Sequence, residues 1–237
     1  MLYLLLACVV FASSARAATV TGQVALVNSD QAAVKAKHDY SGVVVWLEPV
    51  GAAPPRPAGS APKQAVMDQR NKTFIPHVLA IEAGTAVDFP NSDPIVHNAF
   101  SSGDSQVFDL HLYAPQTTRR VVFRRPGIAK VFCNVHESMS AFIAVMSTPY
   151  FAITRRDGGF QIQAPAGAYR LRFWHERSRA DVLAKLEQPL AVGDGNLSVP
   201  RVQVSEEGYT PAPHKDKWGL EYAGARGENI FYPGGRR

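Results

Sequence analysis

The sequence predicts an all-β protein built as a β-sandwich or β-barrel. Its 237 residues contain short runs rich in β-branched and aromatic side chains. Gly, Pro, Asn and Asp interrupt these runs about every 8 to 12 residues, a spacing typical of all-β domains. Few segments show helical periodicity, and 177–186 is a candidate short helix. The expected strands are 19–27, 42–47, 78–81, 86–89, 120–123, 130–132, 141–146, 160–163 and 169–174.

The first residues have the layout of a secretory signal peptide. An apolar run ends in small residues with an Ala-x-Ala site at Ala15 to Ala17, and the run is too short for a membrane span. We therefore expect residues 1–17 to be cleaved near Ala17 and the mature chain to be periplasmic, without stable membrane insertion. A lipoprotein at Cys8 is disfavoured, because Cys8 precedes most of the apolar run, although no Lys or Arg precedes that run.

Removal of the signal peptide leaves Cys133 as the single cysteine. A lone cysteine in an exported protein is a buried inert thiol, an intermolecular bridge or a metal ligand. Cys133, His136 and Met139 form a C-x-x-H-x-x-M motif, and His97 lies on a distant segment. A thiolate, two imidazoles and a weak axial thioether are the donors of a mononuclear copper site. Met139 alone would more often fill a core, but the combination predicts one copper ion.

The formal net charge of +5 is carried largely by Arg pairs, such as 119–120 and 124–125, rather than by one long basic run. This pattern predicts a solvated surface and no nucleic-acid partner. A docking face for an acidic redox partner is the alternative.

The segment from about 64 to 147 resembles the cupredoxin family of plastocyanin and amicyanin, in its strand–turn–strand stretch 71–93, its His97-Asn98 pair and its Cys-His-Met loop. The resemblance implies a Greek-key β-sandwich, assigned to residues 62–147, with a type 1 copper. It also implies that Asn98 hydrogen-bonds the ligand loop and that His136 is the ligand nearest solvent. Two residues depart from the family: Val135 replaces the usual Pro, and Glu137 follows His136 directly.

A second resemblance covers 150–174, where an Asp-Gly turn and a Pro-x-Gly-x-Tyr-x-Leu pattern are similar to the carboxypeptidase-regulatory, transthyretin-like sandwich. The family's opening strands match 20–24 and 42–47. We therefore expect a discontinuous domain, 19–52 with 148–205; alternatively, the N-terminal strands belong to the cupredoxin sheet. The two-part layout is similar to proteins described as methylamine-utilisation or plastocyanin-like. A Pro-rich linker at 51–62 and a polar tail at 206–237 complete the chain.

Together these features predict a periplasmic electron carrier. Its partners would be a dehydrogenase or quinol-linked donor and a cytochrome or oxidase acceptor. A catalytic role is disfavoured, because cupredoxin enzymes with a second copper centre carry a His adjoining the Cys, and here Phe132 and Asn134 flank Cys133. An envelope protein that binds or delivers copper shares every ligand and stays open. A metal-free sandwich would leave Cys133 and His136 unexplained.

Overall fold

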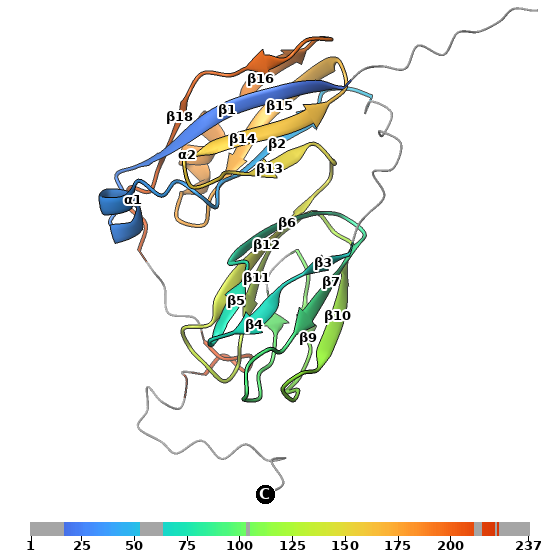
Figure 1. Cartoon of the computed structure of the whole chain (residues 1–237), viewed down its shortest axis with the longest axis vertical. Helices are drawn as coiled ribbons and strands as arrows, with labels where there is room; N and C mark the ends of the chain where they lie inside the picture. The colour runs from blue at the N-terminus through green and yellow to red at the C-terminus, as the bar shows by residue number, and fades with distance from the viewer. Residues whose placement is uncertain (1–16, 53–63, 103–104, 211–214, 221, 223–237) are drawn as a thin grey trace, which may run out of the picture.

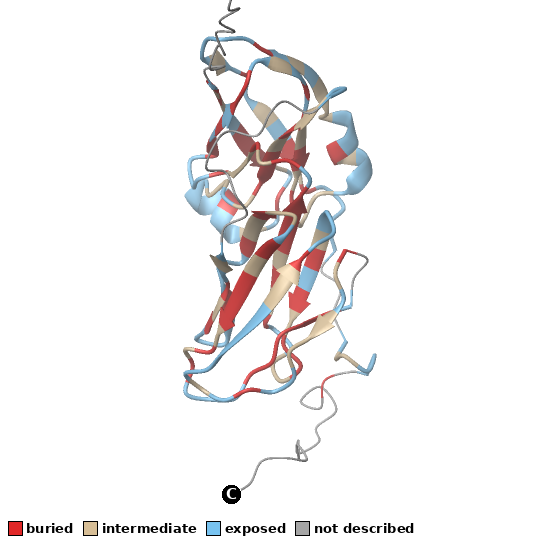
Figure 2. Cartoon of the chain, turned by 90° about the vertical axis from the view of Figure 1, so that its right-hand side faces the viewer, coloured by how far each residue is buried: buried red, intermediate tan, exposed pale blue. Residues whose placement is uncertain are grey.

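The computed structural model describes residues 17–52, 64–102, 105–210, 215–220 and 222, and it contains two β-sandwiches placed end to end (Figure 1). The terminal sandwich is built from β1, β2 and β13 to β18, and the central sandwich from β3 to β12. The prediction of an all-β chain is confirmed. Figure 2 shows buried residues along the strands of both sandwiches and exposed residues mostly in the connections.

The terminal sandwich has one sheet in the order β14-β1-β17, with β18 also paired to β1, and a second sheet in the order β13-β2-β15-β16. Alternate residues of β15, including Tyr169, Leu171 and Phe173, are buried between these sheets, as expected for strands with one face on a core. The elements are β1 (Ala18–Val27), α1 (Ala32–Lys37), β2 (Val44–Pro49), β13 (Phe151–Ile153), β14 (Gly159–Ala164), β15 (Gly167–Trp174), α2 (Ala180–Lys185), β16 (Gln188–Val192), β17 (Leu197–Ser198) and β18 (Val202–Ser205).

The central sandwich has one sheet in the order β10-β7-β3 and a second in the order β6-β12-β11-β8-β9, with the small hairpin β4-β5 beside them. Its core includes Val87, Phe89 and Phe123 from the first sheet and Val131 and Ile143 from the second. The strands are β3 (Ala65–Val66), β4 (Asp68–Arg70), β5 (Thr73–Ile75), β6 (Val78–Glu82), β7 (Thr85–Pro90), β8 (Phe100–Ser101), β9 (Phe108–Asp109), β10 (Thr118–Phe123), β11 (Gly127–Phe132) and β12 (Ser140–Met146).

A separate apolar cluster lies where the two sandwiches meet. Val44 of β2 packs there with Val78 of β6 and with Ala144 and Met146 of β12. Strand β12 therefore buries both faces, one in the central core and one at this junction, which explains why its sequence is apolar almost throughout. Strands β1 and β2 pair with strands that follow residue 147. The division into two domains, one of residues 62–147 and one of residues 19–52 with 148–205, stays a prediction.

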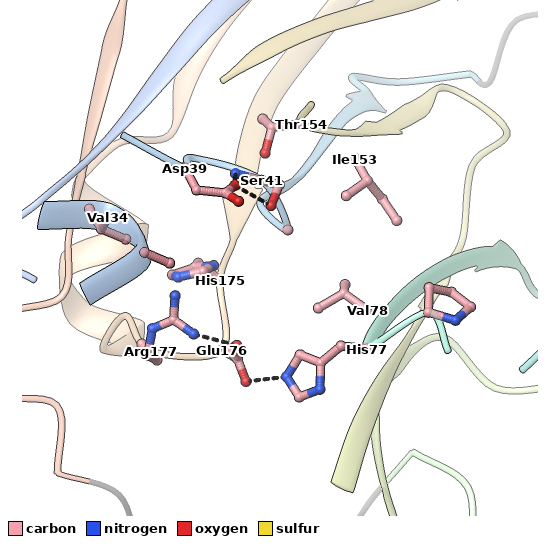
Figure 3. Close-up of a pocket in the computed structure, with 13 residues that line it drawn as sticks. Val34, Asp39, Ser41, His77, Val78, Ile153, Thr154, His175, Glu176 and Arg177 are labelled. Atoms are coloured by element: carbon pink, nitrogen blue, oxygen red, sulfur yellow. Dashed lines mark hydrogen bonds and ion pairs between the residues drawn. The ribbon is translucent and has the colours of Figure 1, made fainter. Parts of the chain in front are cut away.

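A pocket of about 380 Å³ lies at the same junction. Figure 3 shows His77, from the central sandwich, facing Glu176, which follows β15. The Nε2 atom of His77 lies 2.8 Å from a carboxylate oxygen of Glu176, and its Nδ1 atom lies 3.1 Å from the carbonyl oxygen of Ser140. Both partners are acceptors, so the doubly protonated ring satisfies them together. Glu176 accordingly raises the pKa of His77 against the opposing effect of burial.

Three expectations from the sequence concern residues outside the described ranges. They are the signal peptide up to residue 16, most of the linker at 51–62, and residues 211–214, 221 and 223–237 of the tail. Strand β1 begins at Ala18, directly after the expected cleavage site. Within the described ranges, no helix has the length and apolar character needed to cross a bilayer.

Candidate metal centre

Two connections of the central sandwich carry the four residues expected to bind metal. His97 lies between β7 and β8, whereas Cys133, His136 and Met139 fill the connection between β11 and β12. Residues Phe132 and Ser140 pair as the last rung of the β11–β12 ladder. The connection is closed by hydrogen bonds from Cys133 N to Met139 O, at 3.1 Å, and from Met139 N to His136 O, at 3.0 Å. Three donors are thus held on a short loop anchored at both ends by strands.

The fold brings three of the expected ligands together. The ligand atoms of His97, Cys133 and His136 lie within 4.8 Å of one another. The Sγ atom of Cys133 is 3.7 Å from Nδ1 of His97 and 3.9 Å from Nδ1 of His136. Metal–sulfur and metal–imidazole bonds of about 2.3 and 2.0 Å, as in zinc sites, leave sulfur and nitrogen about 3.7 Å apart when the ligand angle is near 120°. The observed separations fit one ion in a trigonal set of donors.

Met139 belongs to the same buried environment. Its side chain is fully buried, in the apolar cluster that also contains Cys133. The two backbone hydrogen bonds of the loop fix its main chain next to Cys133 and His136. A thioether is a soft donor that selects copper over harder ions, and it is a weak axial ligand in copper sites of this donor type. The role of Met139 as the fourth ligand stays a prediction.

Burial differs among the residues expected to bind metal. His97 and Cys133 are fully buried, whereas His136 is partly exposed. The expectation that His136 lies nearest solvent among them agrees with this arrangement. Burial lowers the pKa of His136, and the neighbouring His97 lowers it further. Burial also raises the pKa of the Cys133 thiol. In the metal-free protein His136 is therefore readily neutral, as a ligand must be, and the binding of a metal displaces the thiol proton.

Asp93 orients His97. This carboxylate was not identified from the sequence. Oδ2 of Asp93 lies 2.7 Å from Nε2 of His97, and both side chains are buried. Burial opposes ionisation of Asp93, but the backbone N–H groups of Lys72 and Asn71, together with His97, keep its pKa below the usual value. Because the carboxylate accepts the Nε2 proton, Nδ1 is left with its lone pair facing Cys133. The four-residue separation of Asp93 and His97 was the available signal in the sequence.

Asn98 hydrogen-bonds the ligand loop, as the family resemblance implied. Its Oδ1 accepts from the backbone N–H of Asn134 at 2.6 Å, and its Nδ2 donates to Asp109 at 3.0 Å. The first bond ties the segment after His97 to the segment after Cys133, and the second ties it to β9. Both ligand-bearing connections are therefore held at a fixed distance.

Two further histidines of the described residues, His111 and His175, lie outside this cluster. His111 is exposed and pairs with Asp109. His175 is buried, and its Nε2 lies 2.8 Å from Glu206 within the terminal sandwich, next to the junction pocket. Of the two residues that depart from the family, Val135 is partly buried and Glu137 is exposed.

No protein-family model matches the chain, and no curated protein matches it. Among solved structures the chain is similar to a purple cupredoxin from Nitrosopumilus maritimus, with 23% identity and a TM-score of 0.32 over 35% of this chain and 99% of that one. It is similar to amicyanin from Paracoccus versutus, with 20% identity and a TM-score of 0.32 over 38% and 85%. It is also similar to a copper-containing nitrite reductase from Thermus scotoductus SA-01, with 22% identity and a TM-score of 0.35 over 53% and 28%.

Proposed function

We propose that this chain is a type 1 copper protein of cupredoxin type that carries single electrons between redox partners in the periplasm. The observation that supports it is the clustering of three ligand atoms: the buried thiol of Cys133 and the imidazole nitrogens of His97 and His136 lie within 4.8 Å of one another, and Met139 lies on the same short loop. When bound, copper would supply a one-electron couple between its two oxidation states. His97, Cys133 and His136 would form the trigonal plane, with Met139 as the axial donor.

The residues of the chain suit a carrier because they are rigidly placed. The β11–β12 ladder, the Asn98–Asn134 bond and the Asp93–His97 pair each restrict one ligand-bearing segment. A site that cannot rearrange keeps its donors in place in both oxidation states, which favours rapid electron exchange. The partly exposed His136 would be the point of electron exit. The partners would be a dehydrogenase or quinol-linked donor and a cytochrome or oxidase acceptor.

We propose carriage rather than catalysis because Phe132 and Asn134 flank Cys133, where cupredoxin enzymes with a second copper centre have a His. Delivery of copper within the envelope uses the same ligands and is the alternative outcome of the test below.

The first experiment is the addition of Cu(II) to the purified metal-free protein. We expect intense visible absorption from thiolate-to-copper charge transfer, which a mild reductant bleaches. Cys133→Ser should abolish the band, whereas His111→Ala, which removes an exposed histidine outside the cluster, should preserve it. A colourless wild-type protein, or a band that survives Cys133→Ser, would contradict the proposal.

A second experiment separates carriage from delivery. The copper-loaded protein is mixed either with a soluble cytochrome or with a metal-free copper acceptor protein. Rapid electron exchange with retention of copper supports the carrier. Transfer of copper to the acceptor without electron exchange supports delivery.

A further inference from the structure

The C-terminal segment 215–222 reaches the metal centre. It follows β18, the last strand of the terminal sandwich, yet it lies against the far end of the central sandwich (Figure 1). We call residues 215–220 and 222 the strap. The hydroxyl of Tyr222 donates to the carbonyl oxygen of Cys133 at 2.7 Å, and Tyr222 is only 6% exposed. The backbone N–H of Lys217 donates to Oδ1 of Asn134 at 2.9 Å.

The peptide group that joins Cys133 to Asn134 is held at both of its polar atoms, one by the strap and the other by Asn98. Its carbonyl accepts from Tyr222, and its N–H donates to Asn98. A peptide group is planar, so fixing both polar atoms fixes the orientation of the whole plane. The next N–H along the chain, that of Val135, lies 3.4 Å from the sulfur of Cys133. The orientation of the first peptide therefore bears on the hydrogen bond that reaches the sulfur.

Lys217 joins the strap to the other ligand-bearing connection. Its Nζ lies 2.6 Å from Oδ2 of Asp109, whose Oδ1 accepts from the side chain of Asn98. Asn98 directly follows His97. The strap thus contacts the hydrogen-bond network behind His97 as well as the backbone of Cys133. A tail that only covered apolar surface would not need these directed polar contacts.

We propose that the strap is part of the metal centre, with Tyr222 and Lys217 acting as positioning residues for Cys133. This inference rests on the proposed copper function. Hydrogen bonding and exclusion of water around the cysteine sulfur set the properties of such a site. The strap acts on the first of these, since the Tyr222 hydroxyl holds the carbonyl of the peptide beside the sulfur, and Tyr222 is itself buried there. The terminal sandwich would thereby take part in the copper site through the segment that follows its last strand.

The decisive variant is Tyr222→Phe, which removes one hydroxyl and keeps the ring. Its matched control is Tyr209→Phe, the same change at a tyrosine between β18 and the strap that is 39% exposed. In the metal-free protein, modification of Cys133 by a neutral thiol reagent should be about fivefold faster in Tyr222→Phe, the effect of one lost hydrogen bond. In the copper-loaded protein, the charge-transfer band should shift in wavelength, and copper release to a chelator should be about tenfold faster. Tyr209→Phe should match the wild type in all three measurements.

The outcomes separate this inference from the proposed function. A wild-type protein that never develops the band contradicts the copper function itself. A coloured wild type whose band and copper release are unchanged in Tyr222→Phe overturns the strap proposal, whatever the thiol rate does, because the segment would then only cover the loop. A chain ending at residue 214 is the second variant, and its band should shift in the same direction and further.

Discussion

Nε2 of His97 lies 2.7 Å from Oδ2 of Asp93, and both side chains are buried, with Nδ1 of the same ring facing the cysteine thiol. The same carboxylate accepts the backbone N–H groups of Asn71 and Lys72, at 2.6 and 2.8 Å, in the turn between β4 and β5. Asp93 therefore links the small hairpin to the metal centre. Carboxylate–histidine pairs of this kind fix both the tautomer and the ring orientation of a metal ligand.

Replacing Asp93 should weaken metal binding. Asp93→Ala should lower the affinity for copper by about 10- to 100-fold, because His97 loses the partner that orients its ring. Asp93→Asn keeps an acceptor oxygen and should lie between this variant and the wild type. Competition with a chelator measures the affinity, and thermal unfolding of the metal-free proteins reports the separate loss of the β4–β5 turn. Equal affinity in Asp93→Ala and the wild type would show that the pair has no role in binding.

Met139 is suited to separating packing from ligation. Met139→Leu conserves side-chain volume, so it should cost less than about 1.5 kcal/mol of unfolding free energy in the metal-free protein. Met139→Ala leaves a cavity and should cost about 2 to 5 kcal/mol. In the copper-loaded protein, Met139→Leu should keep the visible band but shift the reduction potential, because the axial donor is lost. Identical potentials in Met139→Leu and the wild type would argue against the thioether as a ligand.

The junction between the sandwiches should respond to pH through His77. Its folded-state pKa is raised, chiefly by Glu176, so its contribution to stability is complete below the unfolded pKa, near 6.5, and is lost as pH rises through the folded value. The pair is partly exposed, so the effect should be at most about 1 kcal/mol. Denaturant unfolding from pH 5.5 to 9 measures it.

The control for this pH effect is His77→Gln, which cannot titrate. Its unfolding free energy should lack the decrease that we expect in the wild type as pH rises through the folded-state pKa of His77. Parallel pH profiles in the two proteins would assign the dependence to other groups. Glu176 contributes in the opposite range: its pKa is lowered despite burial, so its share is lost only as pH falls below the ordinary range of a glutamate.

Glu137 should influence docking rather than affinity for copper. It is exposed and directly follows His136, so its charge lies at the proposed exit edge. Glu137→Gln should slow electron exchange with a cationic cytochrome several-fold at low ionic strength and have little effect at high salt, since rim charges act mainly on association rates. Asp194→Asn makes the same charge change on the terminal sandwich and serves as the control. Equal slowing in both variants would indicate an effect of net charge alone.

The sequence alone predicted much of this protein. Short strand-like runs predicted an all-β chain because alternating burial in a sandwich leaves a period-two pattern that is visible locally. The short strands β3, β8, β9 and β17 were missed, since two residues carry too little pattern, and the longer β16 and β18 were missed as well. The Cys133–Met139 spacing and the donor types indicated a metal-binding loop, because the donors of such a loop lie close together in the sequence.

Only the tertiary structure decided how distant segments meet. Asp93 orients His97 because the β4–β5 turn fixes its carboxylate, and Tyr222 reaches the carbonyl of Cys133 across 89 positions of the chain. The contacts of Asp93 with the β4–β5 turn and of Tyr222 with Cys133 follow no sequence period, since each depends on how connections distant in the chain pack together. The sequence by itself therefore determined the type of fold and indicated the expected donors of the site. The packing of the connections in the central sandwich, and of the C-terminal segment against them, decided which groups hold those donors in place.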